Sequence, residues 1–271
     1  MSKKERHRED LYRLLDEFLK SVDDETLVEY LTSNSSLPGR RANIELTRAF
    51  AEASEEYSAE YETEMWGLCV KLSEISHHEA PVGDPREFLP FCGAQAIGAI
   101  GSVRPGLFEE ATSRLRALAE DPRWRTREAV AFGVQKLLEK EDKRTLNALE
   151  GWIRDGEWLA MRAVAAGVAD PTALKNKKIA GRALGLHREI FDRILASKDR
   201  KSDGFKTLRK GLGYTLSVVV HAIPDEGFGY MRQLADLRDN DAIWIVRENL
   251  KKNRLRRNYP EKTDSVRRLL E

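Results

Sequence analysis

The residues best suited to chemistry in this sequence come in repeated pairs, an aromatic side chain followed four positions later by a polar or charged one. The two clearest copies, residues 124–134 and 158–168, lie 34 residues apart and share six of eleven residues. Four positions are about one helical turn, so both members of a pair lie on one helix face. Each pair therefore offers a ligand an aromatic face beside a polar group. The pairs are Phe91/Gln95, Trp124/Glu128, Trp158/Arg162, Phe205/Arg209 and Trp244/Glu248.

The spacing of these pairs predicts the architecture that must position them. The five aromatics are separated by 33, 34, 47 and 39 residues. Periods of this size are typical of helical solenoids, in which each repeat is a helix pair that buries its apolar face against its neighbours. We therefore predict an all-α, right-handed superhelix of helix pairs. The longest interval contains an expansion, with a further helix expected over residues 179–195.

The N-terminal part of the chain is also expected to be helical, but less regular. Residues 77–85 contain two prolines and a glycine, so we expect a loop there. The predicted organisation is an N-terminal helical extension over residues 1–80, followed by repeats over 81–271 that continue it as one solenoid. The helices expected in the extension cover residues 11–19, 27–31, 44–53 and 65–75.

The polar members of the pairs should form a row along the concave inner surface of the superhelix, flanked by the aromatics. The alternative is purely structural, with the aromatics as packing anchors and the polar residues as a ladder of ion pairs. Asp121 and Asp155 precede the two clearest copies and are expected to cap their helices. The row consists of Gln95, Glu128, Arg162, Arg209 and Glu248.

Composition restricts the class of protein. Lys and Arg number 46 against 45 Asp and Glu, so the net charge of +1 does not point to a nucleic-acid partner. Cys69 and Cys92 are too few for a disulfide framework, and their spacing to His77 and His78 matches no closed zinc pattern. The N-terminus lacks an apolar signal segment, and the longest apolar run, 91–103, is too short to span a bilayer. We expect a cytoplasmic protein without a membrane partner, cofactor or metal.

Glycines 93, 98 and 101 fall within that apolar run. They resemble a dinucleotide-binding fingerprint only superficially, because no strand precedes them. We expect them to allow close helix packing instead.

Three segments, in order, resemble the DNA-alkylation-repair superfamily of HEAT-like repeat proteins, over about residues 85–255. Trp124-x-x-x-Glu128 resembles the family's aromatic followed one turn later by an aspartate. The segment WLAMRA at 158–163 resembles the one that ends in a cleft arginine, here Arg162. The segment FKTLRKGLGYTL at 205–216 resembles the one that supplies a second aromatic wall, here Tyr214. The resemblance implies a HEAT-like solenoid that binds DNA in a concave basic groove and acts in DNA repair.

The best-known members of this superfamily are DNA glycosylases that excise alkylated purines, and the resemblance places Glu128 at the catalytic position. A carboxylate there would stabilise an oxocarbenium-like sugar, and aromatic faces would cradle the developing cation. Glu128 stands where the glycosylases carry Asp, and Tyr214 where they carry Trp. Glutamate reaches one methylene further, and a misplacement of about 1 Å can be costly in rate. Other members bind DNA without glycosylase activity, so we expect DNA binding with weak or no catalysis.

Two alternatives remain open: a glycosylase acting on cationic alkylpurines, and a protein-interaction scaffold whose concave face is apolar or acidic. DNA binding requires basic side chains spaced to meet phosphates. Basic runs at 123–127, 175–178, 206–210 and 251–257 suit this role, although each run could instead be a solvated face balanced by acids. The expected nucleic-acid-binding residues are Trp124, Trp158, Arg162, Arg209, Lys210, Tyr214, Trp244, Lys251 and Lys252.

Overall fold

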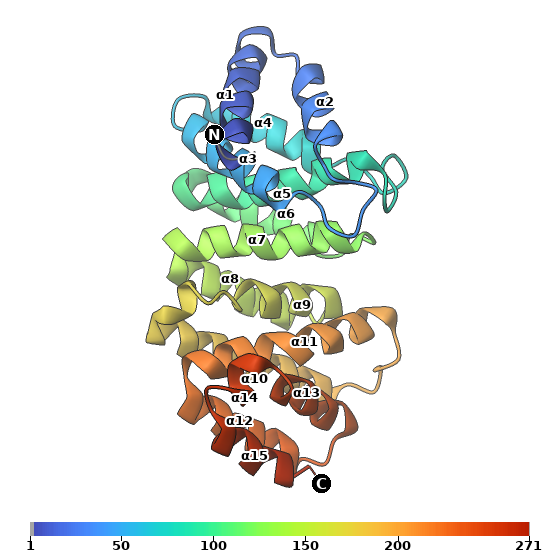
Figure 1. Ribbon diagram of the computed structural model, residues 1–271, viewed down its shortest axis with the longest axis vertical. Helices are drawn as coiled ribbons and strands as arrows, with labels where there is room; N and C mark the ends of the chain where they lie inside the picture. The colour runs from blue at the N-terminus through green and yellow to red at the C-terminus, as the bar shows by residue number, and fades with distance from the viewer. Residues whose placement is uncertain (1–2, 271) are drawn as a thin grey trace. The chain divides into compact units, whose positions relative to one another are not determined.

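Every element of secondary structure in the described part of the chain is helical, which confirms the all-α class. The computed structural model describes residues 3–270, and these residues form fifteen α-helices and three short 3₁₀ turns without a strand (Figure 1). The chain divides into two compact units, of which the first ends at Glu141 and the second begins at Asp142. The expected loop at 77–85 lies inside the first unit. Within residues 3–270, no helix has the combination of length and apolar character needed to cross a bilayer.

The first unit is organised around one buried helix, α5, which packs against α3, α4, α6 and α7. Every side chain of α5 from Phe88 to Ser102 is buried. The four helices expected in the N-terminal part are present as α1 to α4. The helices of this unit are α1 (Lys3–Ser21), α2 (Glu25–Ser33), α3 (Ile44–Tyr57), α4 (Glu62–Ser73), α5 (Phe88–Val103), α6 (Phe108–Leu118) and α7 (Trp124–Lys140), with 3₁₀ turns at Pro85–Glu87 and Pro105–Leu107.

Glycines let the neighbouring helices approach α5 closely, as the sequence predicted. A Cβ on Gly98 would lie 2.3 Å from the carbonyl oxygen of Gly133 in α7. A Cβ on Gly93 would lie 2.6 Å from the backbone nitrogen of Ser73 in α4, and one on Gly101 would lie 2.4 Å from the Cβ of Ala111 in α6. Any side chain at these positions would force the helices apart.

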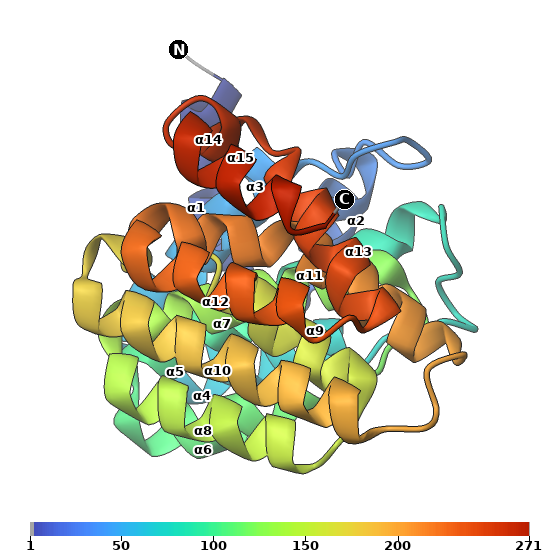
Figure 2. The same cartoon turned by 90° about the horizontal axis from the view of Figure 1, so that it is seen from below.

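The second unit consists of two rows of helices (Figures 1 and 2). Helix α11 packs against both α9 and α13, and Figure 2 shows α8, α10 and α12 lying side by side. The helix predicted over residues 179–195 in the longest interval is confirmed as the 20-residue α10, which follows a 3₁₀ turn at Ala173–Lys175. The helices are α8 (Asp142–Arg154), α9 (Trp158–Gly167), α10 (Lys177–Ala196), α11 (Asp203–Ala222), α12 (Pro224–Asp236), α13 (Asn240–Leu250), α14 (Asn253–Arg256) and α15 (Pro260–Arg268).

The two aspartates expected to cap helices do not do so. Helix α7 begins at Trp124 with Arg123 at its N-cap position, and α9 begins at Trp158 with Glu157 there. Asp121 instead accepts hydrogen bonds from the backbone nitrogen and the guanidinium of Arg123. The sequence pattern missed this because aspartate can bond to backbone groups in a turn as readily as at a helix end.

A buried histidine ties the two rows of the second unit together. His187 of α10 is fully buried, and its Nδ1–H donates to the carbonyl of Ala183 at 2.9 Å. Its Nε2 therefore accepts from the hydroxyl of Thr215 in α11, at 3.0 Å. Burial, which disfavours the charged imidazolium, lowers the pKa of His187 to about 4.

The buried imidazole predicts a loss of stability in mild acid. The unfolded chain binds a proton near the ordinary histidine pKa of about 6.5, whereas the folded protein binds it only near pH 4. The stability that the neutral His187 gives the folded state is thus fully present above about pH 6.5 and declines as the pH falls toward 4. From about pH 7.5 to 5 the His187 contribution to the free energy of unfolding should fall by about 2 kcal/mol.

Urea melts of the wild type and His187→Asn at both pH values measure this effect. The variant should lack the part of the acid-induced loss of stability that is due to His187. The difference in free energy of unfolding between the two proteins should therefore narrow as the pH falls. A difference in free energy of unfolding that is the same at both pH values would contradict the assignment of a neutral, buried imidazole.

Candidate nucleic-acid interface

The near-neutral chain is made of two units of opposite charge. The second unit, from Asp142 onward, contains 27 Lys and Arg against 18 Asp and Glu, a net charge of +9. The first unit contains 19 against 27, a net charge of −8. A polyanion is therefore attracted to the second unit and repelled by the first. Eight of the nine predicted nucleic-acid-binding residues belong to the second unit, and Trp124 alone belongs to the first.

Six of these eight residues lie on helices α9, α11 and α13, and Lys251 and Lys252 follow directly after α13. Close contact is possible because α11 carries glycines toward both neighbours. A Cβ on Gly211 would lie 3.3 Å from the Cγ of Arg162 in α9, and one on Gly213 would lie 3.2 Å from the indole of Trp244 in α13. Arg162 and Trp244 thus lie against the backbone of α11, on opposite sides of it.

Two of the five repeat aromatics are core residues and not part of a surface row. Phe91 and Phe205 are buried, and Phe205 packs edge-on against Trp158 with ring centroids 5.4 Å apart. Gln95 is also buried, and its Oε1 accepts a hydrogen bond from Thr47 at 2.9 Å. The predicted polar row is therefore wrong at Gln95, and its first and fourth aromatics follow the structural alternative.

Arg209 joins α11 to α13 instead of facing outward. Its guanidinium carbon lies 4.0 Å from the ring centroid of Trp244. Its Nε lies 2.8 Å from Asp241, an ion pair too poorly aligned to count as a hydrogen bond. Asp241 also lies 3.5 Å from Arg200, which forms a 2.6 Å ion pair with Asp239. The charge of Arg209 is thus already neutralised within the protein.

The solvent-exposed face of α11 includes the residue that follows Arg209. Lys210 and Tyr214 are exposed and one helical turn apart, so they share this face. Tyr214 is 49% exposed. Arg254 of α14 donates to the Tyr214 hydroxyl at 2.6 Å, and its guanidinium carbon lies 4.7 Å from the ring centroid. The Nζ of Lys252 lies 5.6 Å from the same centroid. Three cations and an exposed ring therefore converge here.

Lys251 is set apart from this cluster by its partner. Its Nζ pairs with Glu248 one turn earlier on α13, at 2.5 Å. We therefore define the α11 face as Lys210, Tyr214, Lys252 and Arg254. Arg254 belongs to the basic run 251–257 that the sequence offers as phosphate-binding. Its contact with Tyr214 depends on α14 packing against α11, which no local pattern reveals.

Trp124 and Glu128 belong to α7 of the first unit. Trp124 is 45% exposed, and the guanidinium carbon of Arg125 lies 4.5 Å from its ring centroid. Glu128 is half-buried at the start of the same helix and engaged in an interaction.

The basic run at 123–127 is structural, which corrects its assignment as a phosphate-binding run. Arg123 is buried and donates to the carbonyls of Ile75, Ser76 and Ala80. Arg125 is buried in a 2.8 Å ion pair with Glu87. Arg127 donates to the carbonyls of residues 121 and 122. Guanidinium groups buried among carbonyls and a carboxylate are not available to DNA.

The cysteines and histidines form no site that the described residues reveal. Burial raises the pKa of Cys69 to about 12 and raises that of Cys92 as well, so both stay as thiols. His77 and His78 lie against each other with ring centroids 3.8 Å apart. Within residues 3–270, no three His, Cys, Asp or Glu side chains are grouped so that they could hold one metal ion.

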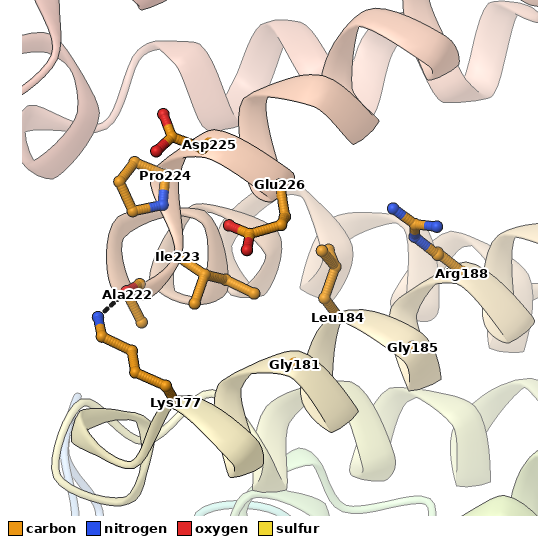
Figure 3. A pocket seen from close by; sticks show the side chains of 10 residues that line it. All are labelled: Lys177, Gly181, Leu184, Gly185, Arg188, Ala222, Ile223, Pro224, Asp225 and Glu226. Carbon is orange, nitrogen blue, oxygen red and sulfur yellow. Dashed lines mark hydrogen bonds between the residues drawn. The ribbon is translucent and has the colours of Figure 1, made fainter.

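A groove of about 550 Å³ lies between α10 and the start of α12 (Figure 3). Lys177 and Arg188 lie on its α10 side, and Figure 3 shows Glu226 at its opposite side, near Asp225. Lys177 is held by a hydrogen bond to the carbonyl of Ala222. Opposite charges on the two sides suit a polyanion poorly, so the groove is not part of the α11 face.

No family model matches the chain, and a comparison with curated proteins finds no match.

The buried ion pair predicts a strong effect of removing Arg125. Arg125→Met leaves the Glu87 carboxylate buried without its cation, so the free energy of unfolding should fall by about 3–5 kcal/mol. Lys140→Met, on the exposed end of the same helix, should change it by less than about 0.5 kcal/mol. Urea denaturation of both variants measures the difference. Equal stabilities would contradict a structural role for Arg125.

Proposed function

We propose that the chain is a HEAT-like helical-repeat solenoid that binds DNA through the α11 face, with weak or no catalysis. The packing of α11 against both α9 and α13 supports the repeat architecture, as does the repeat in the sequence. The observation that carries the DNA-binding proposal is the gathering of Lys210, Lys252 and Arg254 around an exposed tyrosine, in a unit of net charge +9.

The charges of the α11 face are suited to phosphates. Lys210 is exposed, and Lys252 and Arg254 are partly exposed. Arg254 is oriented by the Tyr214 hydroxyl, which leaves its other N–H groups to donate elsewhere. Flexible lysines supply point charges, and an oriented guanidinium can bind a phosphate with two hydrogen bonds. Binding would release counterions from DNA, which makes the affinity fall steeply as the salt concentration rises.

Weak or absent catalysis follows from the chemistry at Glu128. The resemblance assigns the catalytic role to a shorter carboxylate, and Glu128 carries its charge one methylene further from the backbone. Such a displacement can be costly, because electrostatic stabilisation of a sugar cation depends on where the carboxylate is held. We therefore assign the protein a role in DNA repair, in the cytoplasm, in which it recognises DNA but does not excise a base.

A salt series of duplex-binding measurements tests the DNA-binding proposal. We expect Lys210→Ala/Lys252→Ala to bind a fluorescent duplex more weakly than the wild type. The slope of log K against log salt should become shallower by about 2, because each lost phosphate contact contributes about 0.9.

The matched control is Lys178→Ala/Lys198→Ala, which removes the same charge from exposed positions on α10 and the segment after it, outside the α11 face. Lys178 belongs to the basic run 175–178, to which this proposal assigns no DNA contact. Its slope should stay within about 0.5 of the wild-type slope. Equal losses in both variants would mean that only the overall charge of the unit matters. A wild type that binds neither duplex nor single-stranded DNA, even at low salt, would exclude the proposal and favour a protein-interaction scaffold.

A further inference from the structure

We infer that Tyr214 is a stacking platform for an unpaired nucleobase, so that the α11 face prefers single-stranded DNA to intact duplex. This inference rests on the proposed function and names the form of DNA that the same face takes. Its starting point is the position of the aromatic ring, which lies among cations and is half exposed, 49%.

An aromatic ring in this position contributes little to the binding of an intact duplex. Phosphates are recognised by the charges of Lys210, Lys252 and Arg254, and a phenol ring adds no charge to them. Inside a duplex, both faces of each base are covered by neighbouring bases. An unpaired base has a free face, and stacking on an aromatic side chain is the usual way in which proteins bind single strands. The exposed ring therefore gains most from a base that is not paired.

The ring is also held in place before any ligand arrives. The hydroxyl of Tyr214 accepts from Arg254, whose guanidinium carbon is 4.7 Å from the ring centroid. Arg254 in turn is carried by α14, which packs on α11. A side chain already fixed in one orientation loses little conformational entropy when a base stacks on it.

The surrounding cations are placed to bind the phosphates that flank such a base. Lys210 lies one helical turn before Tyr214 on the same face of α11. Lys252 lies at the start of α14, with its Nζ 5.6 Å from the ring centroid. A single strand is flexible enough to place its base on the ring while its backbone follows these charges. Single-strand sites of about 4–16 nucleotides are typical of such basic, aromatic-bearing surfaces.

Trp244 does not compete for this role. Its ring lies against Gly213 of α11, and the residue is only partly exposed. The indole is thereby committed to the contact between α11 and α13. Tyr214 is the aromatic of this part of the described chain whose ring is exposed amid cations.

The test compares a labelled oligo(dT) of about 12 nucleotides with a blunt hairpin duplex, both measured by fluorescence anisotropy. The wild type should bind oligo(dT) more tightly than the hairpin. Tyr214→Leu should weaken oligo(dT) binding by about 5- to 100-fold and hairpin binding by less than about 3-fold. Tyr214→Phe keeps the ring and should retain most of the oligo(dT) affinity.

Tyr61→Leu is the matched control, since Tyr61 is an exposed tyrosine of the acidic first unit. It should leave both affinities unchanged, and circular dichroism melts should show all the variants folded. Hairpin binding that is as tight as oligo(dT) binding, or equal losses for both probes in Tyr214→Leu, would overturn the inference while leaving DNA binding in place. Failure of the wild type to bind either probe would overturn the proposed function itself.

Discussion

The close approach of α11 to its two neighbours is the constraint on which the candidate interface depends. Gly211 and Gly213 remove the side chains that would otherwise separate α11 from Arg162 in α9 and from Trp244 in α13. Arg209 then locks α11 to α13 by lying over Trp244 and pairing with Asp241. With these sides of α11 occupied, Lys210 and Tyr214 are left on its exposed face. The exposure of Lys210 and Tyr214 is thus a consequence of how α11 packs against α9 and α13.

Opposite charges are sorted between the two units, and this sorting is hidden in the net charge of the whole chain. The sum of +1 consists of −8 on the first unit and +9 on the second. Part of the basic excess is used internally, in pairs such as Arg200 with Asp239 and Lys251 with Glu248. Buried guanidinium groups of the first unit, Arg123 and Arg125, act as structural ties and not as a binding surface. What matters for binding is therefore which cations lack an acid beside them.

Hydrophobic periodicity predicted the helices well, because burial of one face leaves a repeating pattern that the sequence shows directly. The packing role of Gly93, Gly98 and Gly101 also followed from sequence, since glycines in an apolar helix have few other uses. The rotation of each helix about its axis did not follow. Aligning Phe205 and Arg209 with Trp158 and Arg162 placed the wrong side of α11 outward, since Phe205 is a core residue and Arg209 lies over Trp244.

The role of a charged residue was the least predictable property. Arg123 and Lys210 look alike in sequence, each in a basic run beside an aromatic residue. One is buried among carbonyls from a distant loop, and the other is exposed. The difference comes from tertiary contacts across more than forty residues, such as Arg123 with Ile75 at a sequence separation of 48. No local pattern carries that information.

Protection of individual lysines from acetylation tests the central claim most directly. The wild-type protein would be treated with an amine-reactive ester with and without DNA, and each lysine followed by mass spectrometry. The account predicts that DNA slows the modification of Lys210 and Lys252, while Lys178 and Lys198 react at unchanged rates. Protection of Lys178 and Lys198 with no change at Lys210 and Lys252 would contradict a binding site on the α11 face.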